Sequence, residues 1–120
     1  MFKQTLKGVV DGTDGGLAGL LMDFEGIPLE TYKRAESDLD IEAVGVEISV
    51  IVKAIQRAAE MLEAGATREV SFRSDRFVTV IRVLDETYFV ALTLAPSGNL
   101  GKARYLLRVA APNLARELSA

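Results

Sequence analysis

The chain has 120 residues, the usual size of one domain, and 49% of them are hydrophobic, which is enough apolar material for a folded core. It has neither cysteine nor histidine, which excludes disulfide frameworks, cysteine nucleophiles, Ser-His triads and the usual zinc sites. The net charge of −3 argues against a nucleic-acid-binding protein. Neither a secretory signal nor an apolar run of about 18 residues is present, so we expect one cytoplasmic domain over residues 1–120 without membrane insertion.

The first part of the chain predicts a short helix followed by two strands. Residues 1–10 carry apolar side chains at helical spacing and lead into the glycine-rich run DGTDGG. Residues 17–23 and 27–33 have strand-like composition, and Gly26 between them can supply the positive φ of a hairpin loop. Pro28 cannot donate to a strand ladder, so we expect the second strand at an edge of the sheet.

The rest of the chain predicts a long helix, three strands and a closing helix. The long helix is expected from Ile41 to Gly65, with Asp38 or Asp40 as its N-cap. Two-residue gaps separate the next three strands, which should form an antiparallel meander over residues 68–74, 76–84 and 87–95. The last helix should start near Asn99, and Pro112 predicts a kink or a restart within it. The order helix-strand-strand-helix-strand-strand-strand-helix predicts an α+β fold with a five-stranded antiparallel sheet.

The long helix carries more apolar surface than one contact with a sheet requires. At about 100° per residue, one arc should face the core: Ile41, Val44, Ile48, Ile51, Val52, Ile55, Ala58, Ala59 and Leu62. A second apolar stripe points in another direction: Ala43, Val46, Val50, Ala54 and Met61. Either the N-terminal helix or a loop covers this stripe, or a second copy of the chain covers it in a homodimer.

The third strand supports an interface without settling it. Residues 68–74 alternate apolar and polar side chains, with Val70 and Phe72 on the apolar side, so the strand should be half exposed. At an edge, its unpaired backbone groups would pair with a second copy or be protected by Arg68 and Arg73. The composition leaves both arrangements open.

The string Gly98-Asn99-Leu100-Gly101-Lys102 resembles a phosphate-binding loop but lacks its spacing. Only two residues separate the glycines, and Ala103 stands where a magnesium-binding hydroxyl is required. We interpret the string as a helix start at which Gly101 permits close packing and Lys102 points outward. No nucleotide or other cofactor is expected here.

The remaining polar motifs also predict neither a catalytic nor a metal site. The DGTDGG run lacks the ordered carboxylates of a calcium-binding loop. Asp23 and Glu25 form a carboxylate pair at an exposed hairpin tip, where nothing would perturb their proton affinity as catalysis needs. An arginine finger would need an exposed and mobile arginine. Arg34, Arg73 and Arg76 are candidates by position, but the sequence selects none of them.

Five segments, taken in order, resemble the Roadblock / dynein light chain family and its bacterial MglB-type members. They are GLLMDFEGIPLE, MLEAG, EVSF, YFVALTL and GNLGKARYLLR. The resemblance implies a profilin-like α/β sandwich that dimerises through the third strand and the second helix. Family members act as non-catalytic partners of small Ras-like GTPases or as scaffolds. MglB-type dimers stimulate GTP hydrolysis without supplying an arginine finger.

Carried onto this chain, the resemblance implies two sets of contact residues. The homodimer interface would contain Ala43, Val46, Val50, Ala54, Met61, Val70, Ser71 and Phe72. A small Ras-like GTPase would contact exposed parts of the same helix at Gly45, Ser49, Lys53 and Gln56. The expected function is a homodimeric regulator or adaptor of such a GTPase, with no active site of its own. The alternative is a dimeric scaffold for a motility, polarity or signalling complex that binds no GTPase.

Overall fold

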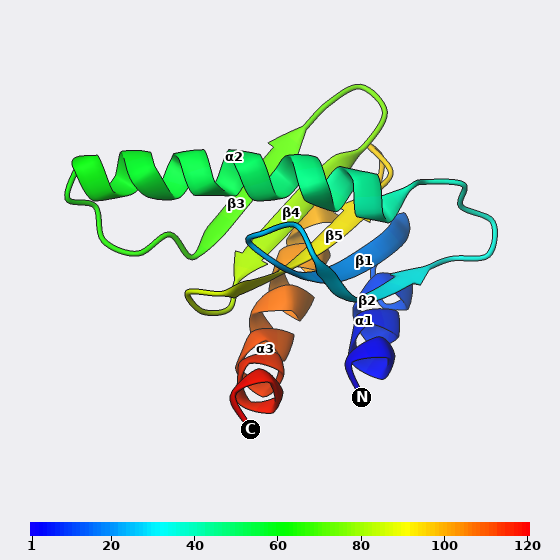
Figure 1. Cartoon of the computed structure of the whole chain (residues 1–120). Helices are drawn as coiled ribbons and strands as arrows, with labels where there is room; N and C mark the ends of the chain where they lie inside the picture. The colour runs from blue at the N-terminus through cyan, green and yellow to red at the C-terminus, as the bar shows by residue number, and fades with distance from the viewer.

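The computed structural model describes residues 1–120 and contains three helices and five strands (Figure 1). The helices are α1 (Phe2–Asp11), α2 (Ile41–Met61) and α3 (Leu100–Ser119). The strands are β1 (Gly16–Asp23), β2 (Pro28–Lys33), β3 (Glu69–Arg73), β4 (Val78–Val83) and β5 (Tyr88–Leu94). The predicted order of elements and the α+β class are therefore confirmed.

The five strands form one antiparallel sheet in the order β2-β1-β5-β4-β3. The last three strands make the predicted meander, which leaves β2 and β3 at the two edges. Pro28 begins β2, where an edge strand tolerates its missing N–H. Gly26 has a φ of 89° and forms the turn between β1 and β2, as expected.

The helices cover the sheet unequally: α1 and α3 lie on one face, and α2 alone crosses the other (Figure 1). Leu6 and Val10 of α1 share a buried cluster with Leu107 of α3. On the other face, Ile48 and Val52 of α2 pack in a second cluster with side chains of β1, β4 and β5. The possibility that the N-terminal helix covers the second stripe of α2 is therefore wrong, because the sheet separates the two helices.

The helix ends follow from local hydrogen bonds. The Asp40 side chain accepts from the Ala43 N–H at 3.1 Å, which selects Asp40 as the N-cap of α2. The helix ends at Met61, earlier than the predicted Gly65, because Glu63 takes the left-handed position with a φ of 54°. The Ala64 N–H then donates to the Ala59 carbonyl at 2.8 Å and closes the helix with a Schellman-type bond.

The start of α3 shows what the Gly-Lys string does. The Asn99 side chain accepts from the Lys102 N–H at 3.0 Å, so the string is a helix cap, as interpreted, and Lys102 is exposed. The close packing expected at Gly101 is wrong, because a Cβ at that position would meet only Asn99 Oδ1, at 3.6 Å. Close packing occurs at Gly98 instead, where a Cβ would lie 2.8 Å from the Asp14 carbonyl oxygen.

Pro112 does not divide the last helix. It lies inside α3, which continues from Leu100 to Ser119. A proline removes one N–H from the helical ladder, but Leu107 and Leu114 on either side of it are buried in the core. Their packing maintains the helix, and the predicted restart does not occur.

Candidate interaction surface

Helix α2 exposes a broad apolar surface on the side away from the sheet. We call this surface the α2 face; it consists of Ala43, Val46, Val50, Ile51, Ala54, Ala58, Met61 and Leu62. Val50 is 59% exposed, and Met61 and Leu62 are each 78% exposed. Isolated apolar residues are common on protein surfaces, but a continuous helix face of this size indicates a contact with another molecule.

The α2 face is wider than the sequence predicts. The helical spacing predicts Ile51, Ala58 and Leu62 in the core arc, but the structure exposes them. The buried arc is narrow because only one flank of α2 meets the sheet, and the buried residues of the helix are Ile41, Gly45, Ile48, Ser49 and Val52. Figure 1 shows the C-terminal end of α2 projecting past the strands. On a helical wheel Ile51 and Leu62 lie about 80–100° from Val52, a displacement that could have marked them as marginal core residues.

The edge strand β3 lies beside this helix with its outer backbone groups unpaired. The Val83 N–H donates to the Arg68 carbonyl at 2.9 Å, and the Ser74 N–H donates to the Phe77 carbonyl at 3.0 Å. The backbone N–H and C=O groups of successive residues in a strand point alternately to its two sides. The backbone groups of the even-numbered residues of this segment therefore face β4. The N–H and C=O groups of Glu69, Ser71 and Arg73 point to the open edge.

The structure leaves the predicted dimer residues accessible. Ala43, Val46, Val50, Ala54, Met61 and Ser71 are exposed, while Val70 and Phe72 are half-buried. Val70 and Phe72 pack against the core cluster beneath α2, so they lie on the same side of the sheet as the α2 face. The helix stripe and the strand predicted to act together thus share one side of the molecule.

Two of the four residues predicted to contact a GTPase are not on an exposed part of α2. Gly45 is buried, and a Cβ there would collide with Leu20 and come within 2.7 Å of Met22 Cε. Ser49 is 3% exposed, and its hydroxyl donates to the Val46 carbonyl at 2.7 Å. Lys53 is exposed and Gln56 is half-buried. The prediction that all four lie on the surface is wrong, because Gly45 and Ser49 fall on the flank that meets the sheet.

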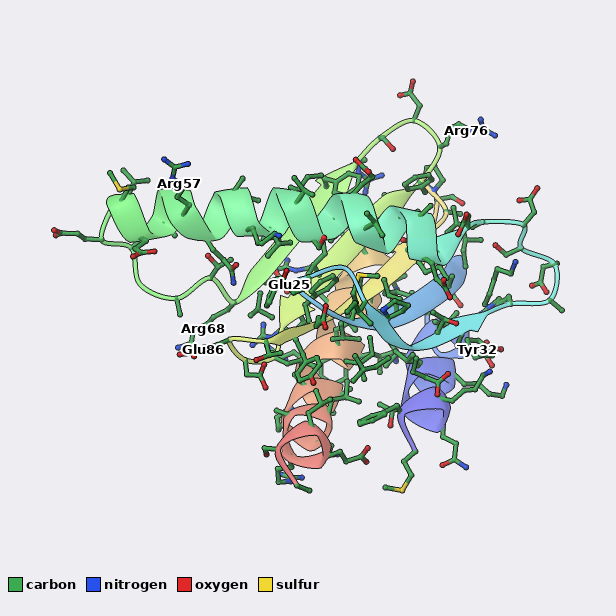
Figure 2. The ribbon with its side chains drawn as sticks, viewed as in Figure 1. Glu25, Tyr32, Arg57, Arg68, Arg76 and Glu86 are labelled. Atoms are coloured by element: carbon green, nitrogen blue, oxygen red, sulfur yellow. The ribbon has the colours of Figure 1, made fainter.

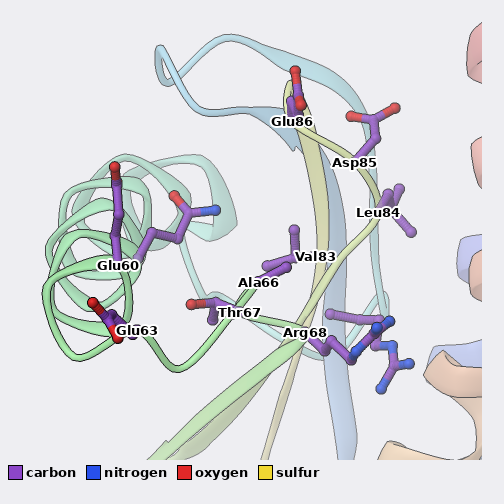
Figure 3. Close-up of a pocket in the computed structure, with 12 residues that line it drawn as sticks. Glu60, Glu63, Ala66, Thr67, Arg68, Val83, Leu84, Asp85 and Glu86 are labelled. Carbon is purple, nitrogen blue, oxygen red and sulfur yellow. The ribbon is translucent and has the colours of Figure 1, made fainter.

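Gln56 lines a groove of about 620 Å³ between the C-terminal half of α2 and the turn that joins β4 to β5 (Figure 3). Glu60 and Glu63 line it on the helix side, and Asp85 and Glu86 line it on the turn. Arg68 and Arg82 also line the groove. No three acidic side chains of the chain are grouped closely enough to hold a metal ion. The groove is a polar hollow beside Gln56.

A small ion cluster fixes the end of α1 against β2. The Asp11 carboxylate accepts from Lys7 Nζ at 2.6 Å and from the Tyr32 hydroxyl at 3.0 Å. Arg34 Nη2 donates to the Val10 carbonyl at 3.2 Å. The hydrogen bond from Lys7 lowers the pKa of Asp11 below its usual range, and the same bond raises the pKa of Lys7. Arg34 is held in this cluster and is not a mobile arginine.

The other polar side chains that the sequence singles out have separate structural contacts. Asp23 accepts from the backbone N–H groups of Glu25 and Ile27 at 2.9 and 3.0 Å, so it shapes the hairpin turn. Arg73 donates to the Pro96 carbonyl at 3.1 Å. Arg76 makes no hydrogen bond or ion pair, and Figure 2 shows it at the tip of the loop between β3 and β4. The structure does not bring these groups together into a site.

Comparison with solved structures relates the whole chain to bacterial proteins. MglC from Myxococcus xanthus is 38% identical over 97% of this chain and 98% of its own, with a TM-score of 0.71. A Roadblock/LC7 domain from Streptomyces avermitilis is 12% identical over 98% of both chains, with a TM-score of 0.87. The gliding protein MglB from Thermus thermophilus is 19% identical over 94% of this chain and 84% of its own, with a TM-score of 0.84. No family sequence profile and no curated protein matches the chain.

These likenesses carry different weight. The Streptomyces and Thermus proteins share the fold of this chain at low sequence identity. The likeness to MglC extends to the sequence along nearly the full length of both chains. None of the three helices has the length and hydropathy needed to cross a membrane. By its fold and its sequence, the chain belongs to the Roadblock/LC7 family, together with bacterial MglB and MglC.

Proposed function

We propose that this protein is a non-catalytic, homodimeric adaptor or regulator that acts on a small Ras-like GTPase in the cytoplasm. The observation that carries the proposal is the exposed α2 face beside the open edge of β3, on one side of the sheet. Both features disfavour an isolated chain, since one exposes apolar surface to water and the other leaves backbone groups free for a partner strand. The name of the Thermus neighbour, a gliding protein, favours motility or polarity as the process.

The proposed homodimer joins two β3 strands about a two-fold axis perpendicular to the sheet. Centring the antiparallel pair on Ser71 lets all outward-facing backbone groups of β3 find partners. It also places Glu69 opposite Arg73 of the partner subunit and Val70 opposite Phe72 of the partner subunit. A shift by one residue either way brings fewer hydrogen-bonded pairs and sets Arg68 against an aromatic ring or Glu69 against Asp75. The self-complementary sequence EVSFR therefore supports this register.

In the proposed complex, Lys53, Gln56 and the groove beside them contact the GTPase. The dimer holds the switch region of the GTPase so that the residues and magnesium of the GTPase itself are positioned for hydrolysis. The test mixes the purified protein with small Ras-like GTPases from the same organism and measures complex formation, GTP hydrolysis and nucleotide exchange. We expect a change in one of these rates that is weakened by Lys53→Glu. Absence of both a complex and a rate change would contradict this part of the proposal.

A dimeric scaffold that binds no GTPase is the second candidate function. The burial of Gly45 and Ser49 favours it, because half of the predicted GTPase contacts are unavailable on this helix. The two functions separate in one experiment. A wild-type dimer that co-purifies with other proteins of its host, but not with any GTPase, would indicate the scaffold.

A further inference from the structure

A second groove lies on the face of the sheet opposite to α2. It has a volume of about 330 Å³ and runs between the outer side of α3 and the end of the sheet formed by β3 and β4. Its lining residues are Glu69, Arg82, Gly101, Arg104, Tyr105 and Arg108. Glu69 and Arg82 are opposite each other in the β3–β4 register, while their neighbours Val70 and Ile81 pack on the α2 side. The alternation of side chains thus directs Glu69 and Arg82 toward α3.

The groove concentrates positive charge in a chain whose net charge is −3. Glu69 is its only carboxylate and pairs with Arg104, whose Nη2 lies 2.7 Å from Glu69 Oε2. Arg104 Nε also donates to Glu69 Oε2 at 2.9 Å, and this hydrogen bond raises the pKa of Arg104. Arg82 and Arg108 form no ion pair within the chain. Their two guanidinium groups are therefore not neutralised by an ion pair, although Arg82 also borders the groove that carries Glu60, Glu63, Asp85 and Glu86.

Apolar surface adjoins these free arginines. Tyr105 is 51% exposed, and the Arg108 guanidinium carbon lies 5.6 Å from the centre of its ring. Val109, the next exposed apolar residue on α3, is 54% exposed. A ligand that offers carboxylates to Arg82 and Arg108 could also place an apolar side chain on Tyr105 and Val109. An inorganic anion would contact only the two arginines and would leave Tyr105 and Val109 uncovered.

We propose that this groove docks an acidic segment of a partner protein that also carries apolar residues. Planar guanidinium groups bind carboxylates in a fork geometry, and an exposed tyrosine gives apolar contact at low cost in conformational entropy. Single surface ion pairs contribute little, so the affinity depends on the arginines acting together with the apolar contact. The docking site does not require dimerisation. In the proposed dimer only its Glu69 end borders the partner strand, while Arg82, Arg108 and Tyr105 lie farther from the seam, toward β4 and on α3.

Fluorescence anisotropy with a defined peptide tests the proposal. The probe is a fluorescein-labelled dodecapeptide of glutamates with a leucine at every fourth position, titrated with the full chain. Arg108→Glu should weaken binding by about tenfold or more, because it replaces a favourable charge contact with a repulsive one. This change leaves the Glu69–Arg104 pair in place. Lys102→Glu makes the same change of charge on an exposed position of α3 outside the groove and should alter binding by less than about twofold.

Two competitors, together with the molar mass of the variants, distinguish docking of an acidic segment from binding of a simple anion or a membrane. Inorganic phosphate and vesicles containing phosphatidylserine should displace the peptide poorly. No binding of the peptide, or equal losses in Arg108→Glu and Lys102→Glu, would overturn the proposal. Binding to the vesicles without binding to the peptide would overturn it in favour of a membrane surface. Both variants should keep the molar mass of the wild type, so that a failure of this proposal is distinct from a failure of the proposed homodimer.

Discussion

Gly45 shows how one missing side chain sets the distance between α2 and the sheet. A Cβ at this position would collide with Leu20 and approach Met22, and both of those side chains are fully buried. Close contact here explains why a glycine occupies the interior of a helix, where it is normally unfavourable. The family resemblance implies an exposed contact residue at Gly45, and the pattern of the helix does not correct it, because the pattern does not reveal how closely the sheet approaches.

We expect Gly45→Val to lower the free energy of unfolding by about 2 kcal/mol, since overpacking a closed core typically costs about 1–3 kcal/mol. Gly8→Val is the matched control: Gly8 lies in α1, and a Cβ there would meet no atom within 4 Å. This control should change stability by less than about 0.5 kcal/mol. Urea unfolding followed by circular dichroism measures both. Equal effects of the two substitutions would contradict the packing argument.

The cluster around Asp11 predicts a pH dependence of stability. Because the bond from Lys7 lowers the pKa of Asp11 from its ordinary value of 3.8, the folded state holds fewer protons than the unfolded state in that range. The resulting stabilisation is complete above about pH 5 and disappears as the pH falls through the lowered pKa of the folded state. The wild type should therefore melt at a higher temperature than Asp11→Asn at pH 7, and this difference should vanish in acid.

Asp75→Asn provides the comparison for this pH series, because Asp75 makes no ion pair. Its melting temperature should follow that of the wild type at every pH. A difference between wild type and Asp11→Asn that persists unchanged below about pH 3 would show that the carboxylate charge is not the cause.

At the scale of the elements, α2 illustrates what a periodic pattern can and cannot predict. The second apolar stripe, with Val46, Val50 and Met61, was predicted from spacing alone, and these residues are exposed. The same spacing places Ile51 and Leu62 in the core, but they are exposed, because the width of a buried arc depends on how a helix crosses its sheet. That crossing is decided by long-range packing. The pattern of one helix therefore predicts the existence of a second contact but not its full extent.

The groove between α3 and the β3–β4 end of the sheet could not be predicted from the sequence, for a related reason. Glu69 and Arg104 are 35 residues apart in the chain and meet only when α3 packs on the sheet. Strand alternation predicts that Glu69 and Arg82 share a face once the β3–β4 register is known. The rotation of α3 about its axis, which turns Arg108 toward them, is a property of the core.

The proposed pairing of β3 makes a prediction about one backbone N–H. The Ser71 N–H points to the open edge, so Ser71→Pro should leave the β3–β4 ladder intact while removing two symmetry-related hydrogen bonds from the proposed dimer. We expect the variant to remain folded by circular dichroism. Its dimer should dissociate at a higher protein concentration than the wild-type dimer does. Ser71→Thr retains the N–H and should dimerise like the wild type. A Ser71→Pro chain that dimerises as strongly as the wild type would exclude pairing through this edge.

At the scale of the whole molecule, the sheet separates two surfaces of different character. One side presents the apolar α2 face and the edge of β3, which we assign to a second copy of the chain. The other side presents the arginine-lined groove beside α3, which we assign to an acidic partner. A dimer built in this way would carry two such grooves on one side and two α2 helices on the other. This separation would allow one adaptor to hold two kinds of partner at once.

The molar mass in solution, measured by light scattering, tests the central claim of a homodimer most directly. The wild type should have twice the chain mass of 13.0 kDa at micromolar concentration. Val50→Glu should have the mass of a single folded chain, because Val50 is 59% exposed in the monomer but an unpaired charge is costly to bury in an interface. Gln4→Glu, an exposed change on α1, should remain dimeric. A monomeric wild type, or a Val50→Glu variant that remains dimeric, would contradict the account.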